Sequence, residues 1–429
     1  MQASTLRFAA LSLFGMFVFG SVAPAQNVAP ALPLDQQRAI EAAARKELRA
    51  FGGSGDPVPG AFIALYVPGK APYVKSVGYA DLHSRAAFRL PDKFRIGSNT
   101  KTFVVTVLLQ LADEHKLRLD DPISKFKLGV KVPNGQNITI RELCEMRSGL
   151  FEAYNTPQFN KMNVTPQTRV TQQQIVGWAV KQKPLFAPGT RWYYSNTNYI
   201  ILGLIIQAVT HDSVENQIRK RLLEPMTLNA TTFPRAPYMP VPYAHGYQLN
   251  AKNQWDDVSV DIPPSVTWAA GAMISTVPDM TRWVKSYVLG TMNSKAMQRQ
   301  RLRCLPTGMG PNLNFGLGIG CSNGWYGYTG GLPGYNTGAY YFPAKDITLI
   351  TFVNAQREKP VPGVANAIVR DITRIITPGN VNFDIGGTPE NAIRNATRQR
   401  GRFVSRESPV RATRRLRSPV KPPLPPQAS

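Results

Sequence analysis

The segments with β-strand character gather near the two ends of this 429-residue chain, and this order restricts the fold more than any other sequence feature. Two of them precede residue 80 and two follow residue 335: residues 61–67, 73–79, 337–342 and 347–353. The sequence between them, as far as about residue 290, has mostly the character of helix and loop. We therefore predict an α+β fold in which strands from both ends form one sheet and a helical region is inserted in the middle.

Three predicted helices accompany this sheet. Residues 35–51 have helical periodicity and end at Gly52-Gly53, and residues 364–376 end at Pro378-Gly379. Residues 100–117 carry apolar side chains at the spacing of one buried helix face: Phe103, Val104, Val107, Leu108 and Leu111. With 43% hydrophobic residues, the chain is long enough to bury one large core or two smaller ones.

The first 25 residues have the pattern of an export signal. Arg7 gives a basic start, residues 8–22 form an apolar run, and Ala23-Pro24-Ala25 provides an A-x-A cleavage site. A membrane anchor is the alternative, but the apolar run is shorter than the roughly 20 residues that cross a bilayer. We therefore expect a periplasmic or secreted protein, cleaved after Ala25.

Much of the formal net charge of +24 lies near the C-terminus. Residues 394–417 are rich in arginine and residues 419–426 in proline, a composition typical of disordered chain. We expect a folded domain over residues 34–378 and a disordered basic tail over residues 380–429. Such a tail either attracts anionic envelope polymers or is a solvated extension without a role. We expect no specific nucleic-acid partner.

The three cysteines are placed for one disulfide and one free thiol. Cys304 and Cys321 enclose a loop of a length that a disulfide can close, and export permits oxidation. Cys144 lies in an apolar helical segment, residues 140–146, where we expect a buried thiol. Neither the cysteines nor the four histidines have the spacing of metal ligands, so we predict no metal site.

The sequence Ser98-Asn99-Thr100-Lys101 stands where a loop enters the helix of residues 100–117. Ser98 and Lys101, three residues apart, share one helix face. A serine hydroxyl is a poor nucleophile near neutral pH and needs a base within hydrogen-bond reach. A lysine one turn away can provide it when burial and the helix N-terminus lower its pKa. Taken alone, the pattern also fits a serine helix cap beside a surface lysine.

Two further motifs accompany S-x-x-K. Tyr194-Ser195-Asn196 ends a loop before an apolar helix, and Tyr328-Thr329-Gly330-Gly331 stands at the head of the late strands. The order S-x-x-K, Y-x-N and x-T-G resembles the active-site triplet of the penicillin-binding protein and serine β-lactamase superfamily. The tyrosine in the second motif resembles the branch of class C β-lactamases, D-alanyl-D-alanine carboxypeptidases and related esterases.

The resemblance extends from about residue 34 to residue 376. It includes Gly78-Tyr79-Ala80-Asp81, Leu119-Asp120-Asp121-Pro122 and Glu224-Pro225-Met226. It implies a β-lactamase/transpeptidase-like fold with an antiparallel sheet and flanking helices. It also implies an exported serine hydrolase that acts through an acyl-enzyme without a cofactor. The implied substrates are peptidoglycan-type D-alanyl peptides, β-lactams or small esters.

By this resemblance, four residues of the first two motifs carry the chemistry. Ser98 would attack the carbonyl carbon, and Lys101 and Tyr194 would share the removal of its proton. Asn196 would hold the amide oxygen of the substrate and help to orient Lys101.

The third motif would line the substrate cleft. Tyr328, Thr329 and Gly330 would contact the substrate, and the backbone N–H groups of Gly331 and Ser98 would form the oxyanion hole. Relatives usually carry Lys or His at the position of Tyr328, where a cation attracts the carboxylate of the substrate. Because tyrosine brings no charge at neutral pH, we expect a preference for uncharged esters or amides.

A second departure from the family pattern precedes the cleft. Relatives often have His-Thr-Ser-Gly-Leu where this chain has Met146-Arg147-Ser148-Gly149-Leu150. We expect the missing histidine to affect packing more than chemistry. Arg147 is a cation that could serve a substrate carboxylate if it reaches the cleft.

Two classes of function remain open at this point. One is the exported serine hydrolase, and the other is a non-catalytic cell-envelope binding protein that keeps the fold. The joint presence of Ser98, Lys101, Tyr194 and Asn196 favours the enzyme, because a scaffold has no chemical need for all four.

Overall fold

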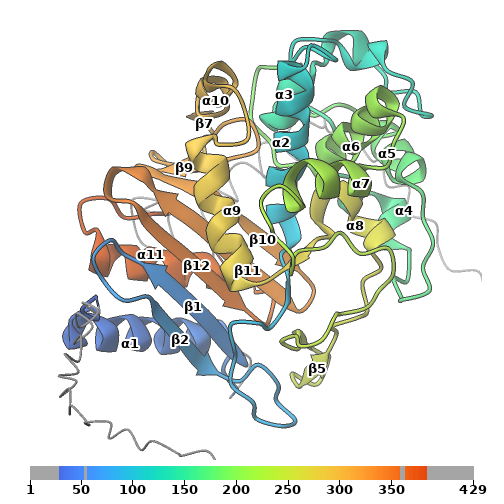
Figure 1. The fold of residues 1–429 in the computed structure, drawn as a ribbon. Helices are drawn as coiled ribbons and strands as arrows, with labels where there is room; N and C mark the ends of the chain where they lie inside the picture. Colours follow the sequence, from blue (N-terminus) through green and yellow to red (C-terminus); the bar gives the residue numbers. More distant parts are fainter. Residues whose placement is uncertain (1–28, 53–55, 358–362, 384–429) are drawn as a thin grey trace, which may run out of the picture.

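The computed structural model describes residues 29–52, 56–357 and 363–383 of the chain (Figure 1). The predicted signal peptide, residues 1–25, lies outside these ranges, as does the predicted tail from residue 384 onward. Residues 380–383, expected to belong to the tail, pack on the domain instead. The indole N–H of Trp325 donates to the carbonyl of Asn380 at 2.8 Å, and Asn382 is fully buried. The folded domain therefore extends beyond the predicted boundary at residue 378.

One antiparallel sheet of eight strands forms the centre of the domain, in the order β2-β1-β12-β11-β10-β9-β8-β7. β12 (Ile347–Val353) lies between β1 (Gly60–Tyr66) and β11 (Tyr335–Phe342), and β2 (Tyr73–Gly78) forms the edge beyond β1. Strands from both ends of the chain thus share one sheet, and the α+β prediction is confirmed.

The register of the central strands follows from burial on both faces. Ile63 of β1 lies opposite Thr351 of β12, which in turn lies opposite Gly338 of β11. Every residue of β11 and β12 is buried. Such complete burial is expected where helices cover both faces of a sheet.

Two terminal helices cover one face of the sheet. α1 (Leu34–Ala50) and α11 (Val364–Ile376) pack against each other and against the central strands (Figure 1). Ile40 of α1 and Ile368 of α11 are fully buried in this layer. The periodicity at both ends of the chain predicted these two helices to within one residue of their observed ends.

The larger core lies on the other face, beneath α9 (Val277–Leu289) and the inserted helical region. There α2 (Thr100–Asp113) packs against α6 (Asn196–Thr210) and α8 (Pro264–Gly271). α2 ends four residues before the predicted end because His115 adopts a left-handed conformation with φ of 57°, which a continuing helix does not allow.

Most of the remaining elements are short. The helices are α3 (Ile140–Cys144), α4 (Pro157–Asn160), α5 (Gln172–Val180), α7 (Val214–Ile218) and α10 (Lys295–Arg301). The strands are β3 (Phe94–Arg95), β4 (Tyr247–Leu249), β5 (Trp255–Asp257), β6 (Ile274–Ser275), β7 (Leu305–Pro306), β8 (Asn314–Phe315), β9 (Gly320–Ser322) and β10 (Trp325–Leu332).

A disulfide joins Cys304 to Cys321 across the β7 to β9 edge of the sheet, as predicted. Cys144 is a buried free thiol at the end of α3, also as predicted. Burial raises the pKa of the Cys144 thiol well above its ordinary value, so this side chain stays neutral. The disulfide therefore fixes the sheet edge, while Cys144 fills the core.

Replacing both Cys304 and Cys321 with serine is expected to lower the free energy of unfolding by about 2–3 kcal/mol, since the bridge closes a short loop in the unfolded chain. Urea denaturation of the wild type and the double variant, each with and without reductant, measures this. Reductant should destabilise only the wild type. Equal stability of all four samples would contradict the prediction.

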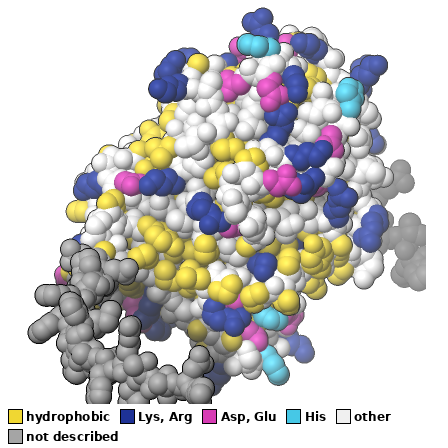
Figure 2. All heavy atoms as spheres, in the orientation of Figure 1, with side chains coloured by type: hydrophobic (Ala, Val, Ile, Leu, Met, Phe, Trp, Pro, Cys, Tyr) yellow, Lys and Arg dark blue, Asp and Glu magenta, His cyan; other side chains and the backbone are white. Residues whose placement is uncertain are grey.

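The described surface carries scattered charge. On the face shown in Figure 2, Lys and Arg side chains are interspersed with acidic ones rather than gathered into one patch. Among the residues described, no helix is long and apolar enough to cross a membrane, and no cluster of His, Cys, Asp or Glu is arranged to hold a metal ion.

Candidate active site

Ser98 and Lys101 lie where a short 3-10 helix, η1 (Gly97–Asn99), leads into α2. The side chain of Ser98 is partly exposed, whereas that of Lys101 is fully buried. The nucleophile candidate thus faces solvent and its basic neighbour faces the core. The sequence also allowed a serine helix cap beside a surface lysine. That alternative does not fit, because Lys101 is not on the surface.

Close backbone packing fixes η1 against β10. Gly97 has φ of 50°, and a Cβ at this position would lie 2.8 Å from the backbone nitrogen of Gly331. A Cβ on Gly330 would lie 2.0 Å from the carbonyl oxygen of Ile96. Only glycine fits at both positions. The predicted oxyanion-hole residues, Ser98 and Gly331, are therefore brought close together.

Three acceptors surround the ammonium group of Lys101. Its Nζ lies 2.9 Å from Ser98 Oγ, 2.8 Å from Asn196 Oδ1 and 2.5 Å from the carbonyl oxygen of Ala270. The carbonyl of Ala270, near the end of α8, was not predicted, because a backbone acceptor leaves no signature in a sequence. These three acceptors use all the hydrogen-bond donors of an ammonium group.

Burial lowers the pKa of Lys101 from its ordinary 10.5 to about 7, and the nearby carboxylate of Glu152 acts in the opposite direction. A group with a pKa near the working pH can accept and return a proton with little cost. A lowered pKa is what a lysine needs if it is to take a proton from a neighbouring serine hydroxyl.

Tyr194 also contacts the hydroxyl of Ser98. Its hydroxyl donates to Ser98 Oγ at 2.7 Å. The Nζ atom of Lys101 lies 5.2 Å from the ring centre of Tyr194 and 5.3 Å from that of Tyr199. Ser98 Oγ is therefore held between a tyrosine hydroxyl and a lysine amine, although Tyr194 is 96 residues away in the sequence.

Asn196 is the first residue of α6, directly after Tyr194-Ser195. Besides accepting from Lys101, it contacts Glu152, which the sequence reasoning did not single out. Glu152 follows Ser148-Gly149-Leu150 by two residues and is buried. The sequence signal for Glu152 is that it is an acidic residue within an apolar segment.

The third motif lies within β10 rather than at its head. Thr329 and Gly331 are partly exposed, whereas Tyr328 and Gly330 are buried. The ring of Tyr328 contacts Phe315, and burial together with the neighbouring hydroxyls of Tyr194 and Tyr199 raises the pKa of Tyr328 well above its ordinary value. Tyr328 is therefore a buried, neutral group beside Tyr194 and Tyr199.

Met146 and Arg147 stand where relatives often have His-Thr, and the structure shows what each of them contacts. Met146 is fully buried, and its Sδ accepts from the backbone N–H of Ser195 and the side chain of Asn198. Arg147 donates from Nη2 to the carbonyl oxygen of Pro306 at 2.7 Å. Met146 thus acts in packing at the start of α6, and the guanidinium of Arg147 is engaged by a neutral group.

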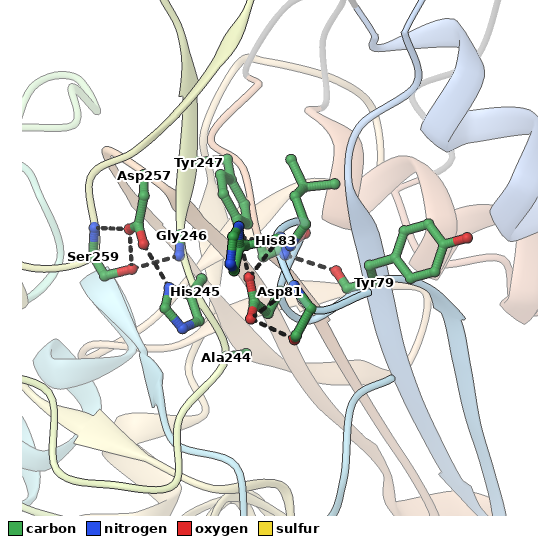
Figure 3. Close-up of polar contacts among 12 residues, drawn as sticks. Tyr79, Asp81, His83, Ala244, His245, Gly246, Tyr247, Asp257 and Ser259 are labelled. Carbon is green, nitrogen blue, oxygen red and sulfur yellow. Dashed lines mark hydrogen bonds and ion pairs between the residues drawn. The ribbon is translucent and has the colours of Figure 1, made fainter. Parts of the chain in front are cut away.

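A separate polar cluster contains His245, Asp257 and Ser259 (Figure 3). His245 Nδ1 lies 2.5 Å from Asp257 Oδ2, and Asp257 also accepts from Ser259. Arg95 donates to the backbone carbonyl of Ser259 at 2.9 Å. Gly246 packs against Tyr335 at the start of β11. Gly246 thus lies against the turn between β10 and β11, and Arg95 connects the cluster to β3, which leads to η1.

Comparison with known proteins places these features in a family. The Beta-lactamase family model matches residues 44–374. Among curated proteins, the chain is 33% identical over 271 residues to "Protein flp" of Staphylococcus aureus (strain MW2), covering 60% of this chain and 51% of that protein. It is 26% identical over 295 residues to "Putative penicillin-binding protein PbpX" of Bacillus subtilis (strain 168), covering 68% and 70%. The chain spans about half the length of the flp relatives.

Solved structures show the same fold. A D-stereospecific amidohydrolase from Streptomyces sp. matches with a TM-score of 0.67 and 28% identity, over 79% of this chain and 99% of that one. A D-amino acid amidase from Ochrobactrum anthropi SV3, complexed with L-phenylalanine amide, matches with a TM-score of 0.69 and 23% identity, over 85% and 99%. The second likeness, at this identity, concerns the fold alone.

Proposed function

The chain belongs to the Beta-lactamase family, and from this premise we propose that it is a serine hydrolase that forms an acyl-enzyme at Ser98. The observation that carries the proposal is the position of Ser98 Oγ, which lies 2.7 Å from the hydroxyl of Tyr194 and 2.9 Å from Nζ of Lys101. A nucleophile within hydrogen-bond reach of a base is the arrangement that covalent catalysis needs.

In the proposed acylation, Ser98 Oγ forms a bond to the carbonyl carbon of an amide or ester. Its proton passes to neutral Lys101, either directly or through the hydroxyl of Tyr194. The carbonyl oxygen becomes an oxyanion, which the backbone N–H groups of Ser98 and Gly331 stabilise. When the bond to the leaving group breaks, that group takes the proton, and Lys101 returns to its neutral form.

Deacylation repeats the sequence with water. The same Lys101 and Tyr194 remove a proton from water as it attacks the acyl carbon, and Ser98 Oγ takes the proton on departure. No step requires a cofactor. Asn196, whose Oδ1 accepts from Lys101, keeps the base aligned through both halves of the reaction.

We propose uncharged amides or esters as the preferred substrates among the D-alanyl peptides, β-lactams and esters that the family suggests. Tyr328 is buried and neutral, so it provides no charge for a substrate carboxylate. The amidohydrolase that is 28% identical to this chain supports amide hydrolysis. A D-amino acid amide or a short-chain ester fits both observations, because neither carries a carboxylate.

Wild-type protein is therefore expected to prefer a methyl ester to the corresponding free carboxylate. A charge-assisted hydrogen bond is worth about 1.5–3 kcal/mol, so the missing cation should cost about ten- to a hundredfold in kcat/KM for the carboxylate. Tyr328→His should recover part of this only where the imidazole is protonated, and because burial at this position lowers the pKa of a histidine, the gain should grow as the pH falls. Tyr328→Phe is the matched neutral control. A strong wild-type preference for the carboxylate, with no gain in the histidine variant, would refute this assignment.

The proposed hydrolase is tested by a screen that compares a D-amino acid amide, a D-Ala-D-Ala peptide, a chromogenic cephalosporin and a nitrophenyl ester. Turnover of any of them, with labelling of Ser98 by a fluorophosphonate, supports the proposal. A protein that binds a fluorescent penicillin reversibly, without covalent labelling, would instead be the non-catalytic binding protein. We also propose export to the periplasm or medium, which detection of a mature N-terminus at Gln26 would test.

A further inference from the structure

Glu152 is a buried carboxylate that the proposed chemistry leaves without a role. Glu152 is 6% exposed and directly precedes the short 3-10 helix η4 (Ala153–Asn155). One oxygen, Oε2, accepts from the backbone nitrogen of Asn196 at 2.5 Å and from Asn196 Nδ2 at 3.3 Å. The other, Oε1, accepts from the backbone N–H of Tyr154 at 3.0 Å. Burying a carboxylate lowers the free energy of unfolding, so its presence here needs a functional explanation.

We propose, resting on the hydrolase function above, that Glu152 is a positioning residue with two tasks. It fixes the amide of Asn196 in the orientation that receives Lys101, and it supplies the counter-charge for Lys101 when that side chain carries the proton taken from Ser98.

The first task follows from the two ends of an amide. An asparagine side chain has an acceptor oxygen and a donor NH2 group, and these differ in what they can face. Because Glu152 accepts from Nδ2, the oxygen Oδ1 points the other way, where it lies 2.8 Å from Nζ of Lys101. A flipped amide would set its NH2 donors against the ammonium group. Glu152 thereby excludes the unproductive orientation.

The backbone contact supports the same task. Ser195, the N-cap of α6, makes no side-chain hydrogen bond to the first turn of that helix. Glu152 takes the N–H of Asn196 instead, and a negative charge at a helix N-terminus is favourable. The carboxylate therefore anchors the start of α6, which carries Asn196 and follows directly on Tyr194.

The second task follows from charge. Glu152 and Lys101 lie on opposite sides of one amide group, and the carboxylate works against the lowering of the Lys101 pKa by burial. Burial raises the pKa of Glu152, but three N–H donors directed at its oxygens favour the ionised form. The neighbouring phenols of Tyr154, Tyr199 and Tyr328 have pKa values raised by burial and stay neutral.

The test measures the titration of Lys101 itself, by NMR of protein labelled with 13C-lysine, because this readout does not depend on turnover. Glu152→Gln keeps an oxygen toward Asn196 but removes the charge. We expect the titration midpoint of Lys101 to fall by about one pH unit, and the acid limb of the kcat/KM profile to move with it. Glu152→Asp, which keeps the charge, should leave the midpoint close to that of the wild type.

Glu145→Gln is the matched control. Glu145 is also 6% exposed, burial also raises its pKa, and it lies just beyond α3, away from Asn196. This variant should leave the Lys101 midpoint unchanged. An unchanged midpoint in Glu152→Gln as well would overturn the inference, whatever the activity. Absence of labelling at Ser98 in the wild type would instead count against the proposed hydrolase function.

Discussion

Ser98→Ala is expected to abolish covalent labelling by a fluorophosphonate and to lower kcat/KM by at least about a thousandfold. The substitution removes a single oxygen atom, which contacts Tyr194 and Lys101 and belongs to the partly exposed middle residue of η1. The fixed packing of Gly97 against β10 does not involve that atom, so the fold should remain intact. Intact-mass spectrometry after exposure to the probe measures the result.

Ser124→Ala is the matched control for this experiment. Ser124 is an exposed serine in another short 3-10 helix, Ile123–Lys125, outside the proposed site. The Ser124→Ala variant should be labelled at Ser98 and should turn over substrate as the wild type does. Stoichiometric labelling of Ser98→Ala would show that another residue is the nucleophile and would remove the basis of the proposed mechanism.

Lys101→Met is expected to slow acylation by about a thousandfold at pH 8, because it removes the base and keeps the length of the side chain. In the wild type, only neutral Lys101 can accept the proton from Ser98. With a pKa of about 7, the acylation rate should rise from pH 6 to pH 8 and then level off. Stopped-flow acylation at a series of pH values checks this. An acid limb that persists unchanged in Lys101→Met would assign it to another group.

The same variant should be more stable than the wild type. Between about pH 7 and the ordinary pKa of 10.5, the unfolded chain holds a proton on Lys101 that the folded protein does not. Wild-type stability therefore rises with pH across this window, and the full cost of burying the lysine is present below it. After allowance for acceptors left unpaired, Lys101→Met should raise the free energy of unfolding by about 2–4 kcal/mol at pH 7.

Urea denaturation at pH 7 and pH 10 tests this sign. The difference between Lys101→Met and wild type should shrink toward the higher pH, because at pH 10 the lysine is neutral in the folded chain and about a quarter neutral in the unfolded chain. Lys93→Met, at a partly exposed lysine that donates to the carbonyl of Val241, should show no such pH dependence. A stability gap that is equal at both pH values would contradict the assigned burial cost.

The sequence predicted those parts of the fold and site that local patterns determine. The central hairpin and the helices at both ends follow from periodicity, and the spacing of Ser98 and Lys101 follows from one helix turn. The approach of Tyr194 required the family resemblance, because no local rule joins residues 96 positions apart.

The surroundings of Lys101 could not be predicted in the same way. Its contact with Ala270 uses a backbone carbonyl, which any residue could supply. The position of Glu152 depends on how the loop before η4 meets the start of α6, a contact across 44 residues. The depth of Tyr328 beside Tyr199 likewise results from packing between β10 and α6. Long-range packing, rather than residue type, determines these features.

The placement of β12 between β1 and β11 has a consequence for the order of events during synthesis. β1 and β2 cannot join the sheet until residue 353 has been made, which at about 5–20 residues per second follows β1 by about 15–60 s. η1 rests on β10 and β11, so Ser98 lacks its support through the same interval. Contacts of such long sequence separation also slow folding. The surroundings of Ser98 are therefore complete only when the last strands have been made, so the proposed hydrolytic activity would be absent from the nascent chain until then.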